Sequence, residues 1–449
     1  MRAALDNAAT WMGGELHGAS VEFSGVSIDT RSLEAGDLFF ALRGPNFDGH
    51  DYVDQAFDKG AAAVVVDQVT HTNGAQLQVD NVRTALGRLG LSWRRRHHPL
   101  TVGITGSNGK TTLKEMIASI FALRGNTLAT AGNLNNDLGV PLMLCRLSDE
   151  HEFAVFEMGA NAQREIAYLT SLVEPDIVLL GNAGPAHLEG FGGIDGVARG
   201  KGEILQGEPR PRCAVLNRDD AYYDFWRPMV DDIDSLSFGL SEAADIRATD
   251  IDSDIEGNRF TLHTDEGAVR IELPLAGEHN VRNACAAAAV ARAAGIGNED
   301  IATGLAAVAP VGGRLKAVDG VGGCRLFDDS YNANPVSVTA AARFLGAIDG
   351  RSVFVFGDMF ELGDDEARIH EDIGRALKEA GIDELHATGT LARRTVSGFG
   401  YGASWYESAE ELADALGPQL DENSSVLVKG SRSMHMERVV DALRAGEVR

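Results

Sequence analysis

The hydrophobic and polar positions between residues 99 and 311 follow two alternating patterns. Short apolar runs such as "LTVGIT", "FAVFE" and "DIVLL" predict buried strands, and helical periodicity follows the first two of them. This order is typical of a mostly parallel sheet with crossover helices. Within the block, "NRFTLHTDEGAVRIELPL" alternates with period two around Asp265-Glu266-Gly267, which predicts a hairpin. The run "VRNACAAAAVARAAG" predicts a buried helix that ends at Gly295.

The two flanking blocks also mix strand and helix patterns. Residues 1–97 contain the strand-like runs "SGVSIDTRS", "GDLFFAL" and "AAAVVVD" together with helical stretches. After "APVGGR" (309–314), the runs "RSVFVFGDM", "ELHATGT" and "SSVLVKGS" alternate with helices. We therefore expect an α/β chain of three domains, 1–97, 98–311 and 312–449. The middle one should be doubly wound and mostly parallel, the last one smaller and Rossmann-like, with hinges near 97–99 and 309–314.

Charge and composition narrow the class of partner. The net charge of −26 over 449 residues argues against a nucleic-acid or anionic-membrane partner. The basic run Arg94–His98 before Pro99 could be a nucleic-acid patch, but we favour the last turn of a helix, where cations suit the helix dipole. No apolar leader and no 18-residue apolar stretch is visible, so we expect neither export nor a membrane span. Four widely spaced cysteines are expected to be reduced core thiols of a cytoplasmic protein: Cys145, Cys213, Cys285 and Cys324.

The segment "LTVGITGSNGKTT" has the features of a phosphate-binding loop. An apolar strand leads into a glycine-rich turn, and a helix should begin at Lys110, so that its positive end favours an anion. Gly106 and Gly109 are expected to let backbone N–H groups face inward. Lysine is scarce here, with seven among 40 basic residues, and its compact charge suits phosphate oxygens whose charge shifts during transfer. Thr111 is placed to ligate Mg²⁺. Because Ile104 replaces the first glycine of the standard motif, an ordinary glycine-rich turn is the alternative.

Three further polar residues follow the predicted strands of the middle block. Glu157 ends "FAVFE", and His187 lies in the loop after "PDIVLLGNAG". Ligands gather at the carboxyl ends of parallel strands, so these two side chains could meet a second Mg²⁺. Read alone, Glu157 could be a cap or ion pair and His187 a hydrogen-bonded loop histidine. Lys201, in the helical stretch "DGVARGKGEIL", could equally be a solvated lysine.

Taken together, "TGSNGKTT", "EMGAN" and "AHLEGFG" resemble the central-domain motifs of the Mur ligase superfamily, the ATP-dependent amide-forming enzymes of peptidoglycan assembly. Four more stretches resemble the branch that adds D-alanyl-D-alanine to UDP-N-acetylmuramoyl-tripeptide: "GNLNNDLGVPL", "DDSYNANPVS", "GDMFELG" and "LVKGSRSMHME". The resemblance covers nearly the whole chain and is weakest in residues 1–97. One departure is Gly200, where the family often has Ala. A superfamily ligase with another substrate, such as a folate polyglutamate ligase, and a P-loop ATPase switch remain the alternatives.

The resemblance implies a set of ligands and a role for each matching residue. ATP, two Mg²⁺ ions, UDP-N-acetylmuramoyl-tripeptide and D-alanyl-D-alanine would bind a monomeric enzyme, and Lys201 would react with CO₂ to become a carbamate. The catalytic group would be Lys110, Glu157, His187 and Lys201, with the metals held by Thr111, Glu157, His187 and carbamylated Lys201. ATP would contact Gly106, Ser107, Asn108, Gly109, Lys110, Thr111, Thr112, Asn280, Asn283, Arg314 and Asp329.

The same resemblance implies three groups of substrate contacts, each with an ordinary alternative as turn formers or surface groups. The N-terminal domain would bind the UDP-sugar through Ser27, Thr30, Arg31, Asn46 and His50. The UDP-linked peptide would face Asn133, Asn135 and Asn136. The incoming dipeptide would be surrounded by Tyr331, Asn332, Asn334, Lys429, Ser431 and Arg432.

Overall fold

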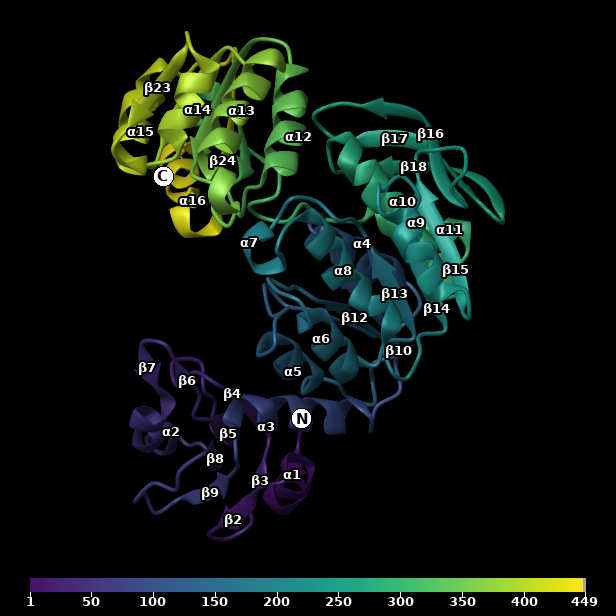
Figure 1. Cartoon of the computed structure of the whole chain (residues 1–449), viewed down its shortest axis with the longest axis vertical. Coiled ribbons are helices and arrows are strands. Elements are labelled where there is room, and N and C mark those ends of the chain that lie inside the picture. Colours follow the sequence, from purple (N-terminus) through teal and green to yellow (C-terminus); the bar gives the residue numbers. More distant parts are fainter. Residues whose placement is uncertain (447–449) are drawn as a thin grey trace.

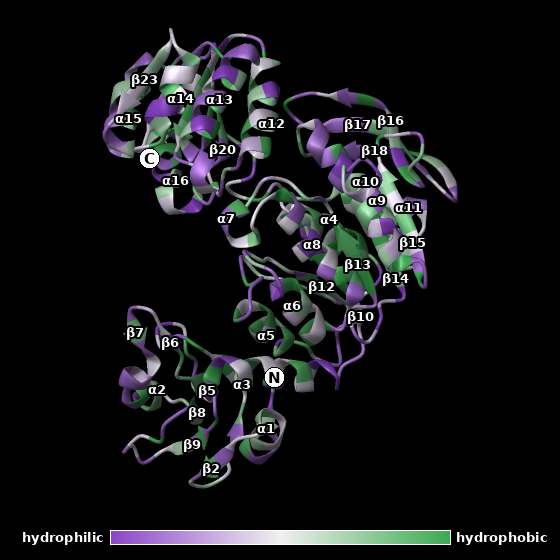
Figure 2. Cartoon of the chain, in the orientation of Figure 1, coloured by the Kyte–Doolittle hydropathy of each residue, from purple (hydrophilic) through white to green (hydrophobic). Residues whose placement is uncertain are grey.

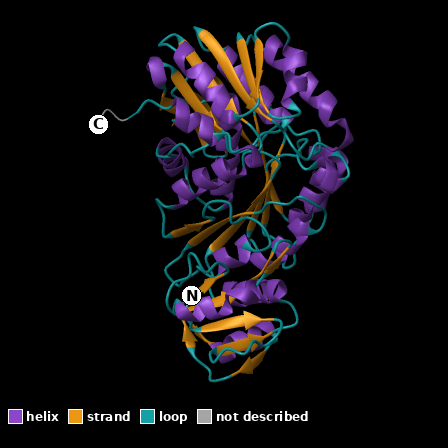
Figure 3. Ribbon diagram, turned by 90° about the vertical axis from the view of Figure 1, so that its left-hand side faces the viewer, coloured by secondary structure: helices purple, strands orange, loops and turns teal. Residues whose placement is uncertain are grey.

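The computed structural model describes residues 1–446, which form three α/β regions arranged as a crescent (Figure 1). The N-terminal region lies at the bottom of this view, the middle region in the centre and the C-terminal region at the upper left. Each region has its own main sheet, and the side view shows the regions stacked along the long axis (Figure 3). Within residues 1–446, the helices are all too short or too polar to span a bilayer.

The N-terminal region is built on a five-stranded sheet of order β2-β9-β8-β5-β4, parallel except for β2. Three of its strands confirm the runs expected from the apolar pattern. Its strands are β2 (Glu15–His17), β4 (Gly25–Ser27), β5 (Asp37–Phe40), β8 (Ala63–Val66) and β9 (Ala75–Gln78), with the short pairs β1 (Ala3–Ala4) with β3 (Glu22–Phe23) and β6 (Arg43–Gly44) with β7 (Phe47–Asp48). Its helices are α1 (Leu5–Met12), α2 (Val53–Asp58) and α3 (Val82–Arg94).

Helix α3 carries the chain into the middle region. Its last residue, Arg94, is buried, and its guanidinium donates to the carbonyls of Val173 (3.0 Å), His97 (2.8 Å) and Glu174 (3.2 Å). These bonds hold α3 against the end of a neighbouring helix of the middle region. The basic run therefore begins at the last residue of a helix, Arg94, and continues through the C-cap Arg95 into the residues after the helix, and Arg94 is not exposed for a nucleic acid.

The middle region has a nine-stranded sheet of order β11-β12-β10-β13-β14-β15-β16-β17-β18, parallel from β11 to β16 and antiparallel from there on. Apolar side chains are buried on both faces, and the parallel strands around β13 appear green in Figure 2, whereas the strands around β16 and β17 are largely purple and white. The strands are β10 (Leu100–Thr105), β11 (Thr127–Ala129), β12 (Phe153–Glu157), β13 (Ile177–Leu180), β14 (Cys213–Asn217), β15 (Asp234–Gly239), β16 (Ile246–Ser253), β17 (Asn258–Thr264) and β18 (Gly267–Leu273). The helices are α4 (Lys110–Phe121), α5 (Gly139–Leu144), α6 (Glu165–Val173), α7 (Leu188–Phe191), α8 (Ile194–Gly202), α9 (Tyr223–Trp226), α10 (Glu278–Ala293) and α11 (Asn298–Ala306).

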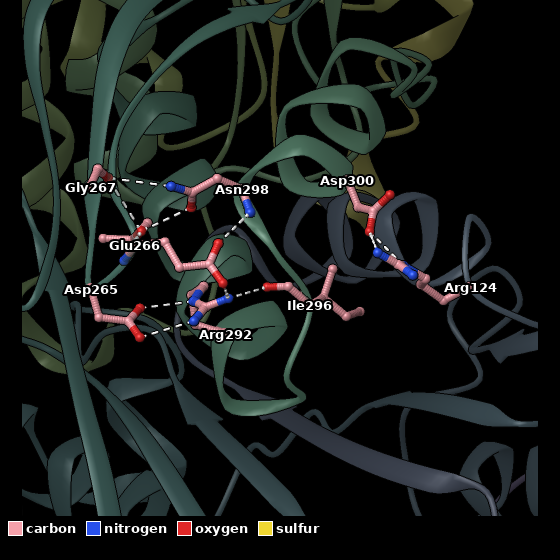
Figure 4. Close-up of polar contacts among 9 residues, drawn as sticks. Arg124, Asp265, Glu266, Gly267, Arg292, Ile296, Asn298 and Asp300 are labelled. Carbon is pink, nitrogen blue, oxygen red and sulfur yellow. Dashed lines mark hydrogen bonds and ion pairs between the residues drawn. The ribbon is translucent and has the colours of Figure 1, made fainter.

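The expected hairpin and Ala-rich helix are both present and are tied together by Arg292 (Figure 4). Thr264 pairs with Gly267 across a two-residue turn. Near the end of α10, Arg292 donates two bonds to the carboxylate of Asp265 (2.8 and 2.9 Å), one to Glu266 (2.7 Å) and one to the carbonyl of Ile296 (2.8 Å). A bidentate arginine fork of this kind fixes both partners in place. The helix end thus holds the turn of the hairpin.

The C-terminal region has a six-stranded sheet of order β19-β20-β24-β21-β22-β23, parallel except for β19. This confirms the third α/β domain expected from the sequence. Its strands are β19 (Lys316–Asp319), β20 (Arg325–Asp329), β21 (Arg351–Gly357), β22 (Glu384–Thr388), β23 (Ala403–Tyr406) and β24 (Ser424–Lys429); its helices are α12 (Pro335–Gly346), α13 (Glu366–Glu379), α14 (Ala392–Phe399), α15 (Ala409–Leu416) and α16 (Glu437–Leu443). All four cysteines of the chain are buried and unpaired, as expected.

Candidate functional site

The polar residues predicted for the middle region meet at one edge of its sheet. Strands β10, β12 and β13 are parallel neighbours, with Ile104 opposite Glu157 and Thr105 opposite Leu180, so their carboxyl ends lie together. A cavity of about 1140 Å³ opens at this edge, between the middle and C-terminal regions. Its lining includes these residues of the middle region: Ser107, Asn108, Gly109, Lys110, Thr112, Asn133, Asn135, Asn136, Glu157, His187, Asn280 and Asn283.

The loop between β10 and α4 leaves several donors without helical partners. Gly109 has φ 81°, a conformation that favours glycine, and a Cβ there would lie 2.8 Å from Oδ1 of Asn283. The first α4 bond runs from the N–H of Leu113 to the carbonyl of Gly109 (2.9 Å), so the N–H groups of residues 110–112 have no intrahelical acceptor. The ammonium of Lys110 donates to the carbonyl of Gly106 (2.8 Å). This arrangement can receive an anion at the helix start.

Two backbone N–H groups of the loop are already hydrogen-bonded to another loop of the middle region. Ser107 and Asn108 donate them to Oδ1 of Asn182, at 3.1 and 2.9 Å, and Nδ2 of Asn182 donates back to the carbonyl of Asn108 (3.1 Å). Sequence reasoning missed Asn182. The signal was its position just after the apolar strand β13, at the edge where the loop lies. Its amide satisfies the N–H groups of Ser107 and Asn108, so the free N–H groups at the start of α4 are the better candidates for binding an anion.

Glu157 is the centre of a buried polar group, with 2% of its surface exposed. Its carboxylate accepts the hydroxyl proton of Thr111 (2.8 Å) and a bond from Nδ2 of Asn135 (2.7 Å). Arg314, from the segment that leads to the C-terminal region, donates to the Thr111 hydroxyl (2.8 Å). Burial lowers the pKa of Lys110, the nearby Glu157 carboxylate opposes this shift, and the Arg314 charge adds to it. Four segments of the chain thus meet around one hydroxyl and one carboxylate.

The donor set suits Mg²⁺ only with help from a substrate. A hydroxyl and a carboxylate are the hard oxygen ligands that Mg²⁺ prefers. Within residues 1–446, however, no three His, Cys, Asp or Glu side chains are grouped as a metal cage. Mg²⁺ often keeps water and phosphate oxygens as most of its ligands. The residues therefore fit a magnesium ion that arrives with a nucleotide.

His187, a residue of the middle region, lines the cavity where it borders the C-terminal region. It directly precedes α7, and its Nδ1 contacts the carboxylate of Glu361 in the C-terminal region. Burial lowers the pKa of His187, the Glu361 carboxylate opposes this shift, and the charges of Lys110 and Lys201 add to it. Glu361 is a second residue that sequence reasoning missed, although it belongs to the quoted "GDMFELG" stretch. His187 therefore connects two regions of the chain.

Lys201 lies inside α8 and does not line the cavity. Only 1% of its surface is exposed, and its ammonium is 5.5 Å from the ring centroid of Phe191. Burial, and secondarily the charge of Lys110, holds the pKa of Lys201 well below its usual value. A Cβ on Gly200 would lie 2.4 Å from Cε1 of the Phe191 ring, so this position of the ring requires glycine at residue 200. The solvated-lysine alternative is wrong.

The residues expected around the dipeptide line the other side of the same cavity. They are Tyr331, Asn332, Asn334, Lys429, Ser431 and Arg432, with Arg314 and Asp329 beside them. The buried ammonium of Lys429 donates to Asp329 (2.7 Å) and to the carbonyl of Asn332 (2.9 Å). The Tyr331 ring has the guanidinium of Arg314 4.4 Å and that of Arg432 5.7 Å from its centroid. This side is polar and cationic, which suits a carboxylate-bearing ligand.

The N-terminal residues expected to bind a UDP-sugar do not line this cavity. Their polar groups are engaged within their own region: Ser27 donates to the carbonyl of Asp29 (3.0 Å), Thr30 to Gln55 (2.9 Å), Arg31 to the carboxylate of Asp29 (2.6 Å) and His50 pairs with Asp48 (2.7 Å), while Asn46 is exposed. The N-terminal region instead contributes Arg83 and Thr84 of α3 to the cavity. Any site at the first set is separate from the cavity.

A glycine-rich loop between strand and helix, a carboxylate on the adjacent strand and a cavity closed by a further α/β region define a multidomain P-loop nucleotide-binding protein. Three family descriptions match the chain: "Mur ligase family, catalytic domain" over residues 22–97, "Mur ligase middle domain" over 104–291 and "Mur ligase, glutamate ligase domain" over 313–432. The chain belongs to the Mur ligase family.

Individual relatives match over nearly the full length. The UDP-N-acetylmuramoyl-tripeptide–D-alanyl-D-alanine ligase of Escherichia coli is 43% identical, over 96% of both chains. A crystal structure of MurF from Acinetobacter baumannii superposes with a TM-score of 0.93 at 37% identity, covering 98% of each chain. The MurF ligase of Thermotoga maritima in complex with ADP has a TM-score of 0.83 at 27% identity, covering 93% of this chain and 96% of the other.

Proposed function

We propose that the protein is an ATP-dependent ligase that joins D-alanyl-D-alanine to UDP-N-acetylmuramoyl-tripeptide through an acyl phosphate, in the cytoplasm. The observation that carries this proposal is the single cavity in which the phosphate loop and Glu157 face the cationic residues Lys429 and Arg432 of the C-terminal region. The substrates in the name of the Escherichia coli relative support the choice of carboxylate and amine. A nucleotide, a carboxylate and an amine can meet there.

The phosphate loop and its neighbours would bind the triphosphate. The Lys110 ammonium donates to the carbonyl oxygen of Gly106 (2.8 Å). When a nucleotide binds, the ammonium would leave this carbonyl and bond phosphate oxygens instead. The N–H groups at the start of α4 would bind oxygens of the same phosphates. Arg314, which already reaches Thr111, would stabilise charge on the transferred group.

Thr111, Glu157 and His187 would hold two Mg²⁺ ions, together with the carbamate proposed on Lys201. When bound, the metal supplies charge stabilisation for the phosphoryl group. The environment of Lys201 favours carbamate formation, because burial lowers the pKa of its ammonium and so favours the neutral amine that attacks CO₂. The nitrogen lone pair forms the new N–C bond while one C=O double bond of CO₂ becomes a C–O⁻ single bond, the proton lost from the nitrogen passes to solvent, and the product is an anion with two oxygen ligands.

The reaction would run in two steps within the cavity. A carboxylate oxygen of the tripeptide attacks the γ-phosphorus of ATP, the bond to the bridging oxygen breaks, and ADP leaves. The amine of the dipeptide then attacks the carbonyl carbon, loses a proton, and phosphate leaves. Docking of the C-terminal region over the loop would exclude water, which otherwise hydrolyses the acyl phosphate.

The N-terminal region would anchor the UDP-sugar away from the chemistry. Ser27, Thr30, Arg31, Asn46 and His50 remain our candidates for that contact. Arg83 and Thr84 are the residues that this region contributes to the cavity lining, so the peptide of the substrate would pass along the start of α3. Asn133, Asn135 and Asn136 would contact it further on.

Phosphate release and product mass test the proposal directly. Release should require both UDP-N-acetylmuramoyl-tripeptide and D-alanyl-D-alanine, and the product should contain both. Release that requires the tripeptide but accepts a single amino acid in place of the dipeptide would instead assign a related ligase. Release indifferent to both would favour a P-loop ATPase switch.

A further inference from the structure

The two polar atoms of the Asn334 side chain serve two different regions. Its Oδ1 accepts the backbone N–H of Ser337 (3.0 Å), and the Ser337 hydroxyl accepts the N–H of Asn334 (3.0 Å), which together form a capping box at the start of α12. Its Nδ2 donates to Oδ1 of Asn108 (2.6 Å), in the phosphate loop. One side chain therefore begins a helix of the C-terminal region and reaches into the nucleotide-binding loop.

Asn108 is held from the opposite side by the middle region. Asn182 accepts its backbone N–H (2.9 Å) and donates to its carbonyl (3.1 Å). The residues that follow Asn108 are Gly109, with φ 81°, and Lys110, the first residue of α4. The orientation of Asn108 thus sets the turn that presents Lys110 and the free N–H groups of α4. Its side-chain oxygen is left for a partner outside the middle region.

Packing at Gly184 shows how closely the two regions approach here. A Cβ on Gly184 would lie 3.4 Å from Nδ2 of Asn108, 3.6 Å from Cβ of Ser107 and 3.9 Å from Cγ2 of Val336. Gly184 also exchanges two bonds with the Ser107 hydroxyl, at 2.9 and 3.0 Å. The phosphate loop, the loop after β13 and the start of α12 therefore meet at one point, where the Asn334 amide has its partner.

We propose that Asn334 is a positioning residue that acts on the nucleotide through Asn108, and that it does not contact the dipeptide as the resemblance implied. The bond between Asn334 and Asn108 forms only when α12 is docked on the loop. A nucleotide that binds best to the ordered loop therefore favours docking, and docking strengthens nucleotide binding by the same factor. The proposal rests on the proposed function only in naming the C-terminal region as the carrier of the second substrate.

Calorimetric titration of ADP and Mg²⁺ into the full-length protein tests this coupling. Asn334→Ser keeps a good helix cap, because serine is also preferred there, but is too short to reach Asn108. It should weaken ADP binding about three- to tenfold, the value of one hydrogen bond. Asn108→Ala should weaken it to a similar extent, and the double variant should be no weaker than either single one. Additive losses would overturn the proposal.

Ser337→Ala is the matched control at the same helix end. It removes the other half of the capping box and leaves Asn334 free to bond Asn108, so ADP affinity should stay at the wild-type value. An equal loss of ADP affinity in Ser337→Ala would assign the effect to the helix start and overturn the proposal. So would unchanged ADP affinity in Asn334→Ser with a raised KM for D-alanyl-D-alanine. ADP binding can be measured without the ligase reaction. The result therefore tests the role of Asn334 even if the proposed function is wrong.

Discussion

Two polar clusters at the middle region are both rich in hydrogen bonds. They differ in whether their charged groups are neutralised by one another. The Arg292 cluster consists of Arg292, Asp265 and Glu266, and its carboxylates are exposed and matched by the arginine (Figure 4). In the edge cluster of Lys110, Thr111, Glu157 and Arg314, the carboxylate is buried and accepts its hydrogen bonds from neutral groups, the Thr111 hydroxyl and the Asn135 amide, while the two cations lie nearby without bonding it.

The pKa directions separate the two clusters in the same way. The hydrogen bonds that Arg292 donates to the Asp265 carboxylate lower the pKa of Asp265 and raise the pKa of Arg292, as expected for a satisfied ion pair. Burial instead lowers the pKa of Lys110, so its charged form lacks full compensation from the chain. The difference teaches that a functional cluster is recognised by a charged group that its neighbours do not fully neutralise, because this group can then bind a ligand. Side chains with shifted pKa values gather at such sites. We therefore expect variants of the edge cluster to lose activity and variants of the Arg292 cluster to lose stability.

Lys201→Ala should have the largest effect on the edge cluster's chemistry. Ligase turnover should fall on the order of 1000-fold, the loss expected when charge stabilisation of a transition state is removed. Short-chain carboxylates should partly restore it, because they can replace the missing anion. Lys201→Arg, which keeps a cation but cannot readily form a carbamate, should be equally inactive. Turnover is measured as phosphate release with and without added carboxylate; full activity of Lys201→Ala without rescue would contradict the carbamate.

Lys110→Arg should follow, with turnover reduced about 100-fold despite conserved charge, because a rigid fork replaces a compact ammonium beneath the loop. Steady-state kinetics at saturating substrates measure this loss. The control is Lys378→Arg, at a lysine of α13 that bonds the carbonyl of Tyr401 far from the cavity, and its kinetics should match the wild type. A wild-type rate in Lys110→Arg would show that only charge matters at this position.

His50→Ala should separate the N-terminal region from the edge cluster. The KM for the UDP-linked substrate should rise about tenfold, the value of one hydrogen bond to a charged ligand. ADP affinity should not change, because His50 does not line the cavity. His17→Ala, in the same region and paired with Gln78, serves as the control. If neither variant alters that KM, His50 does not contact the UDP-sugar.

Arg292→Ala should lower stability and leave the kinetics unchanged. We expect the free energy of unfolding to fall by about 1 kcal/mol, since a partly exposed ion-pair network contributes modestly. Arg292→Lys should lose about half as much, because it keeps the charge but not the fork. Denaturant unfolding of all three proteins measures the difference. A raised KM for ATP in Arg292→Ala would break the division between the two clusters.

The same variant has a defined pH dependence. Arg292 lowers the pKa of Asp265 in the folded protein, so this part of the stability is fully present above the ordinary aspartate pKa of 3.8. It is lost as the pH falls through the lowered pKa. The stability difference between wild type and Arg292→Ala should therefore be constant near neutral pH and shrink below about pH 4. A difference that grows on acidification would contradict the ion-pair account.

Much of the fold could be predicted because it is encoded in local patterns. The strand runs, the hairpin at Asp265 and the start of α4 at Lys110 all depend on residues close in sequence. The burial of Lys201 could not be predicted, since it depends on the Phe191 ring folding over α8. Nor could the bond between Asn334 and Asn108, which joins residues 226 positions apart.

The phosphate loop shows the same limit at close range. Its glycines and lysine predicted an anion site, but the pairing of the Ser107 and Asn108 N–H groups with Asn182 comes from the neighbouring strand's loop. Motifs indicate which residues could bind a ligand or take part in a reaction. They do not indicate which hydrogen-bond donors stay free for a ligand, because that depends on the loops of neighbouring strands in the sheet.

The most direct test of the account is a crystal structure with Mg²⁺, a non-hydrolysable ATP analogue and UDP-N-acetylmuramoyl-tripeptide. The triphosphate should lie against the start of α4, with the Lys110 ammonium moved from the Gly106 carbonyl to a phosphate oxygen and the tripeptide carboxylate facing the γ-phosphate. A nucleotide bound elsewhere, or a Lys110 that stays on Gly106 beside a bound triphosphate, would contradict it.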